Sequence, residues 1–235
     1  MWTTRATKCI GFITHALGRQ AEVQGDLGYF GLGHWWLHTF TLAQQEYIEA
    51  AYQPPDLPAA SRPLTKGKRS SDAQTAACLL TAIATGLFKR PDDRGLACQI
   101  LAKAEDRALA EGDMLGLHFT YQEMVRLHHT WREQFTDALD LAFAASYKQM
   151  RIAPQVAAAF HEAYPDKPLP PHIGYEMMAA ILEKQGDYAQ AIDLCKQARS
   201  QNWPGNWDWR IQRMTKKLGY PVTFISSAGI TPITL

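Results

Sequence analysis

Two histidines near the N-terminus have the spacing that metal chelation on a helix requires. His34 and His38 are four residues apart, so on a helix both imidazoles would lie on one face. The zinc-hydrolase pattern with this spacing also needs a glutamate directly after the first histidine as general base, and Trp35 occupies that position. A metal-dependent hydrolase centred on His34 and His38 is therefore one alternative hypothesis. We favour packing of the pair in an aromatic cluster or its partial exposure, and we expect no metal ion, no cofactor and no catalytic residue.

Paired carboxylates could perform acid–base chemistry, but their positions favour a structural role. Asp92 and Asp93 follow Pro91, where a helix is expected to begin, and Asp137 lies near another expected helix start. A carboxylate at a helix N-terminus accepts hydrogen bonds from unpaired amides and is stabilised by the helix dipole. We therefore interpret these aspartates as helix caps.

Two clusters of basic residues, one of them beside tryptophans, make a nucleic-acid interface the other alternative. Aromatic rings among cations can stack on bases while the cations contact phosphates. The whole chain carries 24 Lys and Arg against 23 Asp and Glu, however, and a net charge of +1 provides no broad field for a polyanion or an anionic membrane. We therefore expect neither a nucleic acid nor a membrane as a partner. The first cluster comprises Arg62, Lys66, Lys68 and Arg69, and the second comprises Arg210, Arg213, Lys216 and Lys217 beside Trp203, Trp207 and Trp209.

The cysteines and the lack of long apolar runs favour a cytoplasmic protein. Cys9, Cys78, Cys98 and Cys195 form no C-x-x-C pair, and the last three lie in Ala- or Leu-rich helical patterns that predict reduced, buried thiols. The apolar run at residues 10–17 is interrupted by polar residues and is too short for a membrane span, which needs about 18 apolar residues.

The distribution of Pro, Gly and apolar residues divides the chain into four parts. Residues 1–55 form an aromatic-rich helical segment, residues 56–72 a Pro-rich loop, residues 73–218 a series of helical hairpins and residues 219–235 a tail. The expected fold class is therefore all-α.

Local signals place individual helices within the first two parts. We expect a helix from Thr3 to Val23 and a short one from Leu42 to Tyr52. Thr41 before the second helix and Gln44 three residues later match the capping box, in which each side chain satisfies an exposed amide. Beyond the loop, Ser71 or Asp72 is expected to cap the next helix. Between the first two helices lies the aromatic cluster Tyr29, Phe30, Trp35, Trp36 and Phe40.

Apolar residues at helical spacing predict three pairs of helices and a final helix from Asp208 to Leu218. A Pro-rich loop from Tyr164 to Pro171 separates the second and third pairs, and only Val222 to Ile225 in the tail has a strand-like pattern. The second helix of each pair carries two alanines two turns apart, where a small side chain lets a neighbouring helix approach closely. These alanines are Ala97 and Ala104, Ala138 and Ala145, and Ala191 and Ala198.

The third pair resembles the tetratricopeptide repeat (TPR) family, whose unit is a helix, a tight turn and an antiparallel helix. Gly186 suits a left-handed helix end, and Asp187 can cap the helix that follows. The anchoring alanines are 41 and 53 residues apart instead of a uniform repeat length, so we expect an irregular stack of hairpins, a TPR-like α-solenoid. The residues at the family's repeat positions are Tyr175, Met178, Ala179, Leu182, Gly186, Tyr188, Ala191 and Ala198.

Several longer stretches are similar to uncharacterised bacterial TPR-like proteins, among them Gly31 to Thr41, Pro168 to Tyr175 and Trp203 to Ile211. The resemblance implies a helical-repeat fold and no particular reaction. We therefore predict a non-enzymatic scaffold whose groove between first helices binds an unidentified protein or peptide. The candidate groove residues are Gln122, Arg126, His129, His172, Glu176 and Lys184.

Overall fold

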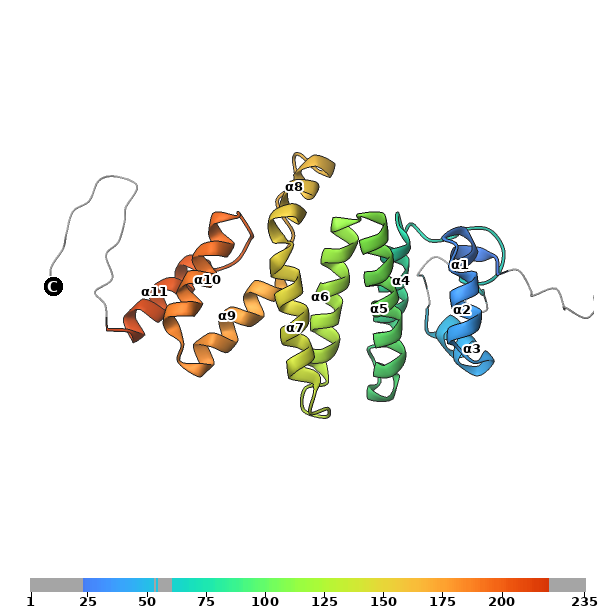
Figure 1. The fold of residues 1–235 in the computed structure, drawn as a ribbon, viewed down its shortest axis with the longest axis horizontal. Helices are drawn as coiled ribbons and strands as arrows, with labels where there is room; N and C mark the ends of the chain where they lie inside the picture. Colours follow the sequence, from blue (N-terminus) through green and yellow to red (C-terminus); the bar gives the residue numbers. More distant parts are fainter. Residues whose placement is uncertain (1–22, 53, 55–60, 220–235) are drawn as a thin grey trace, which may run out of the picture. The chain divides into compact units, whose positions relative to one another are not determined.

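The computed structural model describes residues 23–52, 54 and 61–219, and its regular elements are all helices (Figure 1). The all-helical prediction is confirmed for these residues. The expected helix from Thr3 to Val23 and the strand-like Val222 to Ile225 lie outside them, apart from Val23 itself. The chain forms two compact units that divide between Asp72 and Ala73.

Three short helices form the N-terminal unit: α1 (Gly25–Tyr29), α2 (Gly33–Thr39) and α3 (Leu42–Ala51). Their apolar residues Leu27, Trp36, Phe40 and Ile48 are buried. At the start of α3 the hydroxyl of Thr41 accepts from the amide of Gln44, and the Gln44 side chain accepts from the amide of Thr41. The predicted capping box is therefore confirmed.

The part of the predicted loop that follows residue 60 is held against α1 and α3 by two buried carboxylates. Asp26 accepts from the amides of Ser70 and Ser71 at 2.7 and 3.1 Å. Glu49 accepts from the amide of Leu64 at 2.8 Å, and Leu64 is fully buried. The described loop is thus packed into its unit, because acidic side chains on the helices satisfy its main-chain donors.

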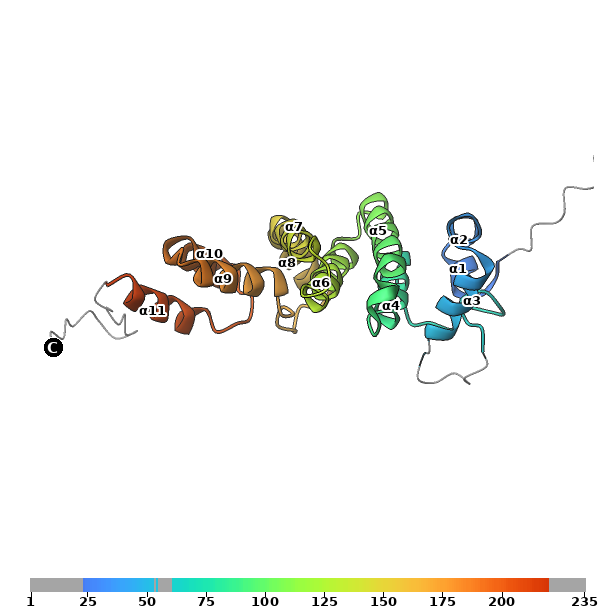
Figure 2. The ribbon, with the colours of Figure 1, turned by 90° about the horizontal axis from the view of Figure 1, so that it is seen from below.

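Helices of the second unit follow one another closely along the chain. Figures 1 and 2 show α4 to α7 side by side and α9 to α11 continuing from them. Most consecutive helices pack directly against one another, and α6 also contacts α4, α8 and α9. Their bounds are α4 (Ala76–Gly86), the 3₁₀ turn η1 (Pro91–Asp93), α5 (Arg94–Glu111), α6 (Met114–Thr130), α7 (Ala138–Arg151), α8 (Ala153–Ala163), α9 (Ile173–Gln185), α10 (Tyr188–Ser200) and α11 (Trp207–Lys217).

One local prediction about a helix start is wrong, and one helix was missed. The cap of α4 is Thr75, whose hydroxyl accepts from the amide of Cys78, and not Ser71 or Asp72. Ser71 instead donates its amide to Asp26, an acceptor that is distant in the sequence. Helix α8 was not expected at all, although Pro154 suits a first helical turn and Val156 and Phe160, one turn apart, are both buried.

Small residues allow the helices of this unit to pack closely. The six paired alanines of α5, α7 and α10 are all buried, as are Tyr175 and Ala179 of α9. Gly186 ends α9 with a φ of 80°, and Asp187 caps α10 by accepting from the amide of Gln190. These features of the predicted hairpin from Tyr175 to Ala198 are confirmed.

The burial of Ala191 gives a direct test of this packing. Replacing Ala191 with Leu should lower the free energy of unfolding by about 1 to 3 kcal/mol, because the added atoms have no space beside α9. Lys184 is exposed in the same hairpin, so Lys184→Ala should leave the free energy of unfolding nearly unchanged. Urea unfolding followed by circular dichroism measures both. The opposite ranking would show that the packing between α9 and α10 is different.

Candidate functional site

The first helices of the first two hairpins, α4 and α6, run parallel and in contact. The hydroxyls of Thr81 and Thr120 lie 3.1 Å apart, across 39 residues of sequence. Ala77 and Gly116 are also 39 residues apart in the sequence, and a Cβ added to Gly116 would lie 3.1 Å from the Cβ of Ala77. It would also overlap the Asp113 carboxylate, so glycine is required where α6 begins beside α4.

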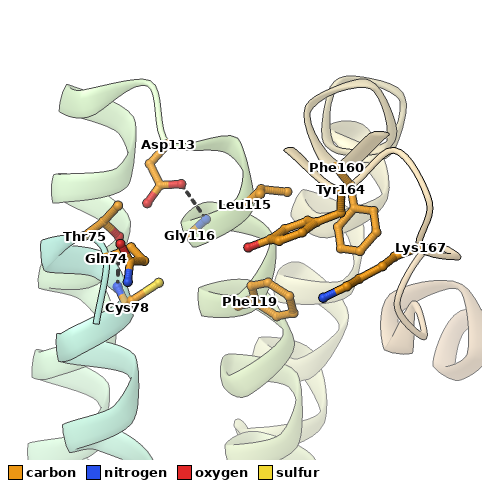
Figure 3. Close-up of a pocket in the computed structure, with 10 residues that line it drawn as sticks. All are labelled: Gln74, Thr75, Cys78, Asp113, Leu115, Gly116, Phe119, Phe160, Tyr164 and Lys167. Carbon is orange, nitrogen blue, oxygen red and sulfur yellow. Dashed lines mark hydrogen bonds between the residues drawn. The ribbon is translucent and has the colours of Figure 1, made fainter. Parts of the chain in front are cut away.

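An apolar cleft of about 360 Å³ opens beside this contact, bounded by the N-terminal ends of α4 and α6 and by the end of α8 (Figure 3). Most of its wall area is apolar, and its aromatic and aliphatic residues are Leu115, Phe119, Phe160 and Tyr164. Figure 3 shows Phe160, Tyr164 and Lys167 extending from the α8 side toward α6. The lining residues are Gln74, Thr75, Cys78, Asp113, Leu115, Gly116, Phe119, Phe160, Tyr164 and Lys167.

One oxygen of the acidic side chain in the cleft caps a helix, and the other oxygen, Oδ2 of Asp113, has no hydrogen-bond partner among the described residues. The Asp113 carboxylate accepts from the amide of Gly116 at 2.7 Å, and Thr75 caps α4 in the same way. These caps satisfy amides that would otherwise attract an anion. On the opposite wall, the ammonium of Lys167 lies 5.1 Å from the Tyr164 ring centroid and is exposed. Lys167 is therefore the accessible charge at the cleft.

One face of α6 continues from the cleft along the helix. Leu115, Phe119, Gln122, Arg126 and His129 recur every three or four residues, and all five are at least partly exposed, whereas most residues between them are buried. Three of the predicted groove residues therefore share a face with the cleft.

Charges concentrate near the end of this face. Arg126 forms an ion pair with Glu123 at 3.2 Å. Burial lowers the pKa of His129, and the positive charges of Arg132 and Lys184 lower it further. Lys184 lies in the last turn of α9, a helix that contacts α6. Among the described residues it forms no ion pair.

The prediction that His172 faces a groove is wrong, because its side chain is fully buried. Its Nδ1 accepts from the amide of Tyr175 at 3.3 Å and so caps α9. The ring packs edge-on against Trp203, with centroids 4.6 Å apart. A histidine thus takes the place of the usual short polar cap residue. The surrounding aromatic rings bury its imidazole. Glu176 is only partly exposed, in the first turn of the same helix.

His172 belongs to a buried polar cluster that sequence reasoning missed, in which helices α6, α7 and α9 meet. Gln149 donates to the His118 carbonyl at 3.2 Å and accepts from the Gly174 amide at 2.8 Å. The His118 ring stacks on Trp203, with centroids 5.5 Å apart. Burial lowers the pKa of His118 to about 4, and burial together with His118 lowers that of His172 to about 3. Both imidazoles are therefore neutral at neutral pH.

The hydrogen bonds of His172 oppose metal binding by this histidine. Because Nδ1 accepts a hydrogen bond, the proton of the neutral ring is on Nε2. A metal ligand must present a lone pair, and Nε2 presents a proton instead. We therefore interpret the cluster as structural.

His34 and His38 lie on one face of α2, as their spacing implies. Their rings stack with centroids 3.9 Å apart, and Nδ1 of His38 is 2.7 Å from the His34 carbonyl oxygen. Both side chains are exposed. Across the described residues, no three His, Cys, Asp or Glu side chains are grouped so that they could hold a metal ion.

The two basic clusters differ in what they offer to a nucleic acid. Arg69 lies over the Tyr29 ring at 4.6 Å in the N-terminal unit. In α11, Arg213 lies over the exposed Trp209 at 4.0 Å. Trp203 and Trp207 are buried, so neither is available to stack on a base.

An arginine, a histidine and an aspartate come together where α5, α6 and α7 meet, and Cys98 lies one turn along α5 from that arginine. Arg94 forms an ion pair with Asp137 at 3.0 Å and approaches Nδ1 of His128 at 3.5 Å. Burial raises the pKa of the Cys98 thiol and lowers that of His128 to about 4. Nucleophilic catalysis needs a depressed thiol pKa, so these shifts oppose it.

None of the described helices is long and apolar enough to cross a lipid bilayer. No protein-family model, no curated protein and no solved structure matches this chain. The cleft between α4, α6 and α8 and the face of α6 that continues from it are therefore the features from which a function has to be argued.

Proposed function

We propose that this protein is a non-enzymatic scaffold of TPR-like helical hairpins that binds a segment of another protein in the cleft between α4, α6 and α8. The observation that carries the proposal is the cleft itself. Most of its wall area is apolar, and it has room for one or two large apolar side chains. An open apolar pocket with few polar groups suits an anchoring side chain of a polypeptide.

The helix order supports a hairpin repeat. Helices α4 and α5, α6 and α7, and α9 and α10 make three pairs, and the first helix of each later pair contacts both helices of the pair before it. Stacked hairpins of this kind leave a surface between their first helices on which partners bind. The cleft lies on that surface, and α8, which lies between the second and third pairs, closes one side of it.

The unpaired thiols support a cytoplasmic location as part of this proposal. Cys78, Cys98 and Cys195 are all free in the structure, as expected in a reducing compartment.

Filling the cleft should abolish binding. Cys78 lines the cleft and is only partly buried, so Cys78→Trp would place an indole in the space that an anchor would occupy. The probe is a phage-displayed library of random twelve-residue peptides, panned on the purified full-length protein. We expect peptides with a large apolar residue whose affinity for Cys78→Trp falls at least tenfold, because a filled pocket loses its anchor.

Leu109→Trp is the matched control, since Leu109 is exposed on the second helix α5. It should bind the selected peptides as the unmodified protein does. A selection that yields no peptide sensitive to Cys78→Trp would overturn the proposal.

A further inference from the structure

Two exposed histidines lie one turn apart on α2. His34 and His38 are both exposed, whereas Trp36, two residues from each of them, is buried. The two imidazole rings stack with their centroids 3.9 Å apart and their planes inclined by 21°. The pair therefore presents two adjacent imidazoles to solvent, on the face of α2 opposite the core of the N-terminal unit.

The hydrogen bond of His38 gives its ring the tautomer of a metal ligand. Nδ1 of His38 lies 2.7 Å from the carbonyl oxygen of His34, and a carbonyl oxygen can only accept, so Nδ1 carries the proton. In the neutral ring the lone pair is then on Nε2. Histidines that bind metal ions almost always donate their other ring N–H to a carbonyl or a carboxylate, which fixes the orientation of the ring. His172 shows the reverse arrangement, because its Nδ1 accepts a hydrogen bond.

The ring of His34 is available to complete the pair. Among the described residues, its ring nitrogens have no hydrogen-bond partner, and the side chain is exposed. An exposed ring can rotate between staggered conformations at little cost, and such a rotation brings one of its nitrogens beside Nε2 of His38. Histidines four residues apart on a helix reach a common metal ion in this way.

We infer that His34 and His38 chelate one divalent transition-metal ion, with water completing its coordination. Imidazole nitrogen suits Ni²⁺, Cu²⁺ and Zn²⁺, whereas Mg²⁺ and Ca²⁺ prefer oxygen ligands. No third His, Cys, Asp or Glu in the described part of the chain is placed to join the pair, so the ion keeps positions that water or a donor from another molecule can occupy.

The inference goes beyond the proposed function and does not depend on it. None of the residues that line the cleft belongs to the N-terminal unit. Trp35, in place of the glutamate of the zinc-hydrolase pattern, argues against hydrolysis and does not bear on binding. The site is therefore a binding site for a metal ion and not a hydrolytic centre.

Nickel is the probe, because Ni²⁺ suits imidazole whereas Zn²⁺ also binds free thiols. Isothermal titration calorimetry of the full-length protein with NiCl₂, without an affinity tag, should show a single site per chain. His34→Gln and His38→Gln should each weaken this site by at least about tenfold, because a single remaining imidazole no longer chelates the ion. Both side chains are exposed, so neither change should alter the thermal stability of the metal-free protein.

Two controls separate chelation from the mere presence of histidines. His161→Gln removes an exposed histidine of α8 and should leave the affinity for Ni²⁺ unchanged. His38→Gln combined with Thr39→His keeps the number of histidines, since Thr39 is the exposed last residue of α2. It places the second ring five residues from His34, about 140° around the helix. This double variant should bind Ni²⁺ as weakly as His38→Gln alone.

Each possible result decides the question. The inference fails if the protein binds no Ni²⁺, or if either single variant keeps the affinity of the unmodified protein. Recovery of binding when Thr39→His is added, or an equal loss with His161→Gln, also overturns it, because histidines in any position would then suffice. None of these results bears on the cleft, which the peptide selection tests separately.

Discussion

Acidification from pH 7 to pH 5 is expected to lower the free energy of unfolding, and each of two fully buried histidines should contribute about 2 kcal/mol to this loss. His118 and His172 are fully buried, with pKa values lowered to about 4 and about 3. In the unfolded chain both return to about 6.5. Below pH 6.5 the unfolded chain therefore binds protons that the folded protein excludes.

The direction of the effect follows from these values. The stability contributed by the neutral imidazoles is complete above pH 6.5 and is lost as the pH falls from there toward 4 for His118 and toward 3 for His172. Burial is the first cause for both, and the remaining charge effect on His172 comes from His118 itself. His128, whose pKa burial also lowers to about 4, should add a loss of similar size over the same pH range.

Urea unfolding at a series of pH values measures this dependence. His172→Asn is the informative variant, because an asparagine at this position can still cap α9 but does not titrate. Its stability should fall about two-thirds as steeply between pH 6.5 and 5 as that of the unmodified protein, because His118 and His128 still titrate. An unchanged slope would show that His172 is not responsible.

Replacing Gly174 with Ala should destabilise the fold by about 2 to 3 kcal/mol. A Cβ at this position would lie 2.8 Å from Oε1 of Gln149 and 2.9 Å from the Ser146 carbonyl oxygen. The fully buried Gln149 side chain already joins three helices and has no room to retreat. The substitution should therefore break hydrogen bonds as well as crowd the interior.

Gly95→Ala is a closely matched control that should change the stability of the fold in the opposite direction. Gly95 is the second residue of α5, as Gly174 is of α9, but nothing lies within 4 Å of a Cβ built on it. Alanine there should stabilise the protein by about 0.5 to 1 kcal/mol, because it reduces the freedom of the unfolded chain. Denaturant midpoints rank the two variants. Equal effects would mean that the contact between α7 and α9 is looser than the structure shows.

Local sequence signals predicted most helices because those signals act within one or two turns. The capping box at Thr41 and Gln44 and the turn at Gly186 and Asp187 need only neighbouring residues to form. The predicted cap of α4 was wrong because the Ser71 amide binds Asp26, 45 residues earlier in the chain. Such long-range pairing leaves no local pattern.

The buried state of polar side chains was the least predictable feature. His172 has the sequence context of an exposed residue after a Pro-rich loop, yet Trp203 and His118 enclose it. The cleft was missed for a related reason. Phe119 could be placed on a helix, but Phe160 and Tyr164 come from α8, which was not expected, and only the packing of α8 beside α6 brings them together.

The sequence by itself determined that the described chain is helical, where most of its helices lie and which alanines face inward. These properties follow from periodicity, capping and residue size, which are local. Only the tertiary structure decided that α6 presents an apolar cleft at one end, and that His118 and His172 are kept neutral. The physical reason is that burial and cavity shape depend on side chains contributed by helices far apart in the sequence, and their contacts exist only once the helices have packed.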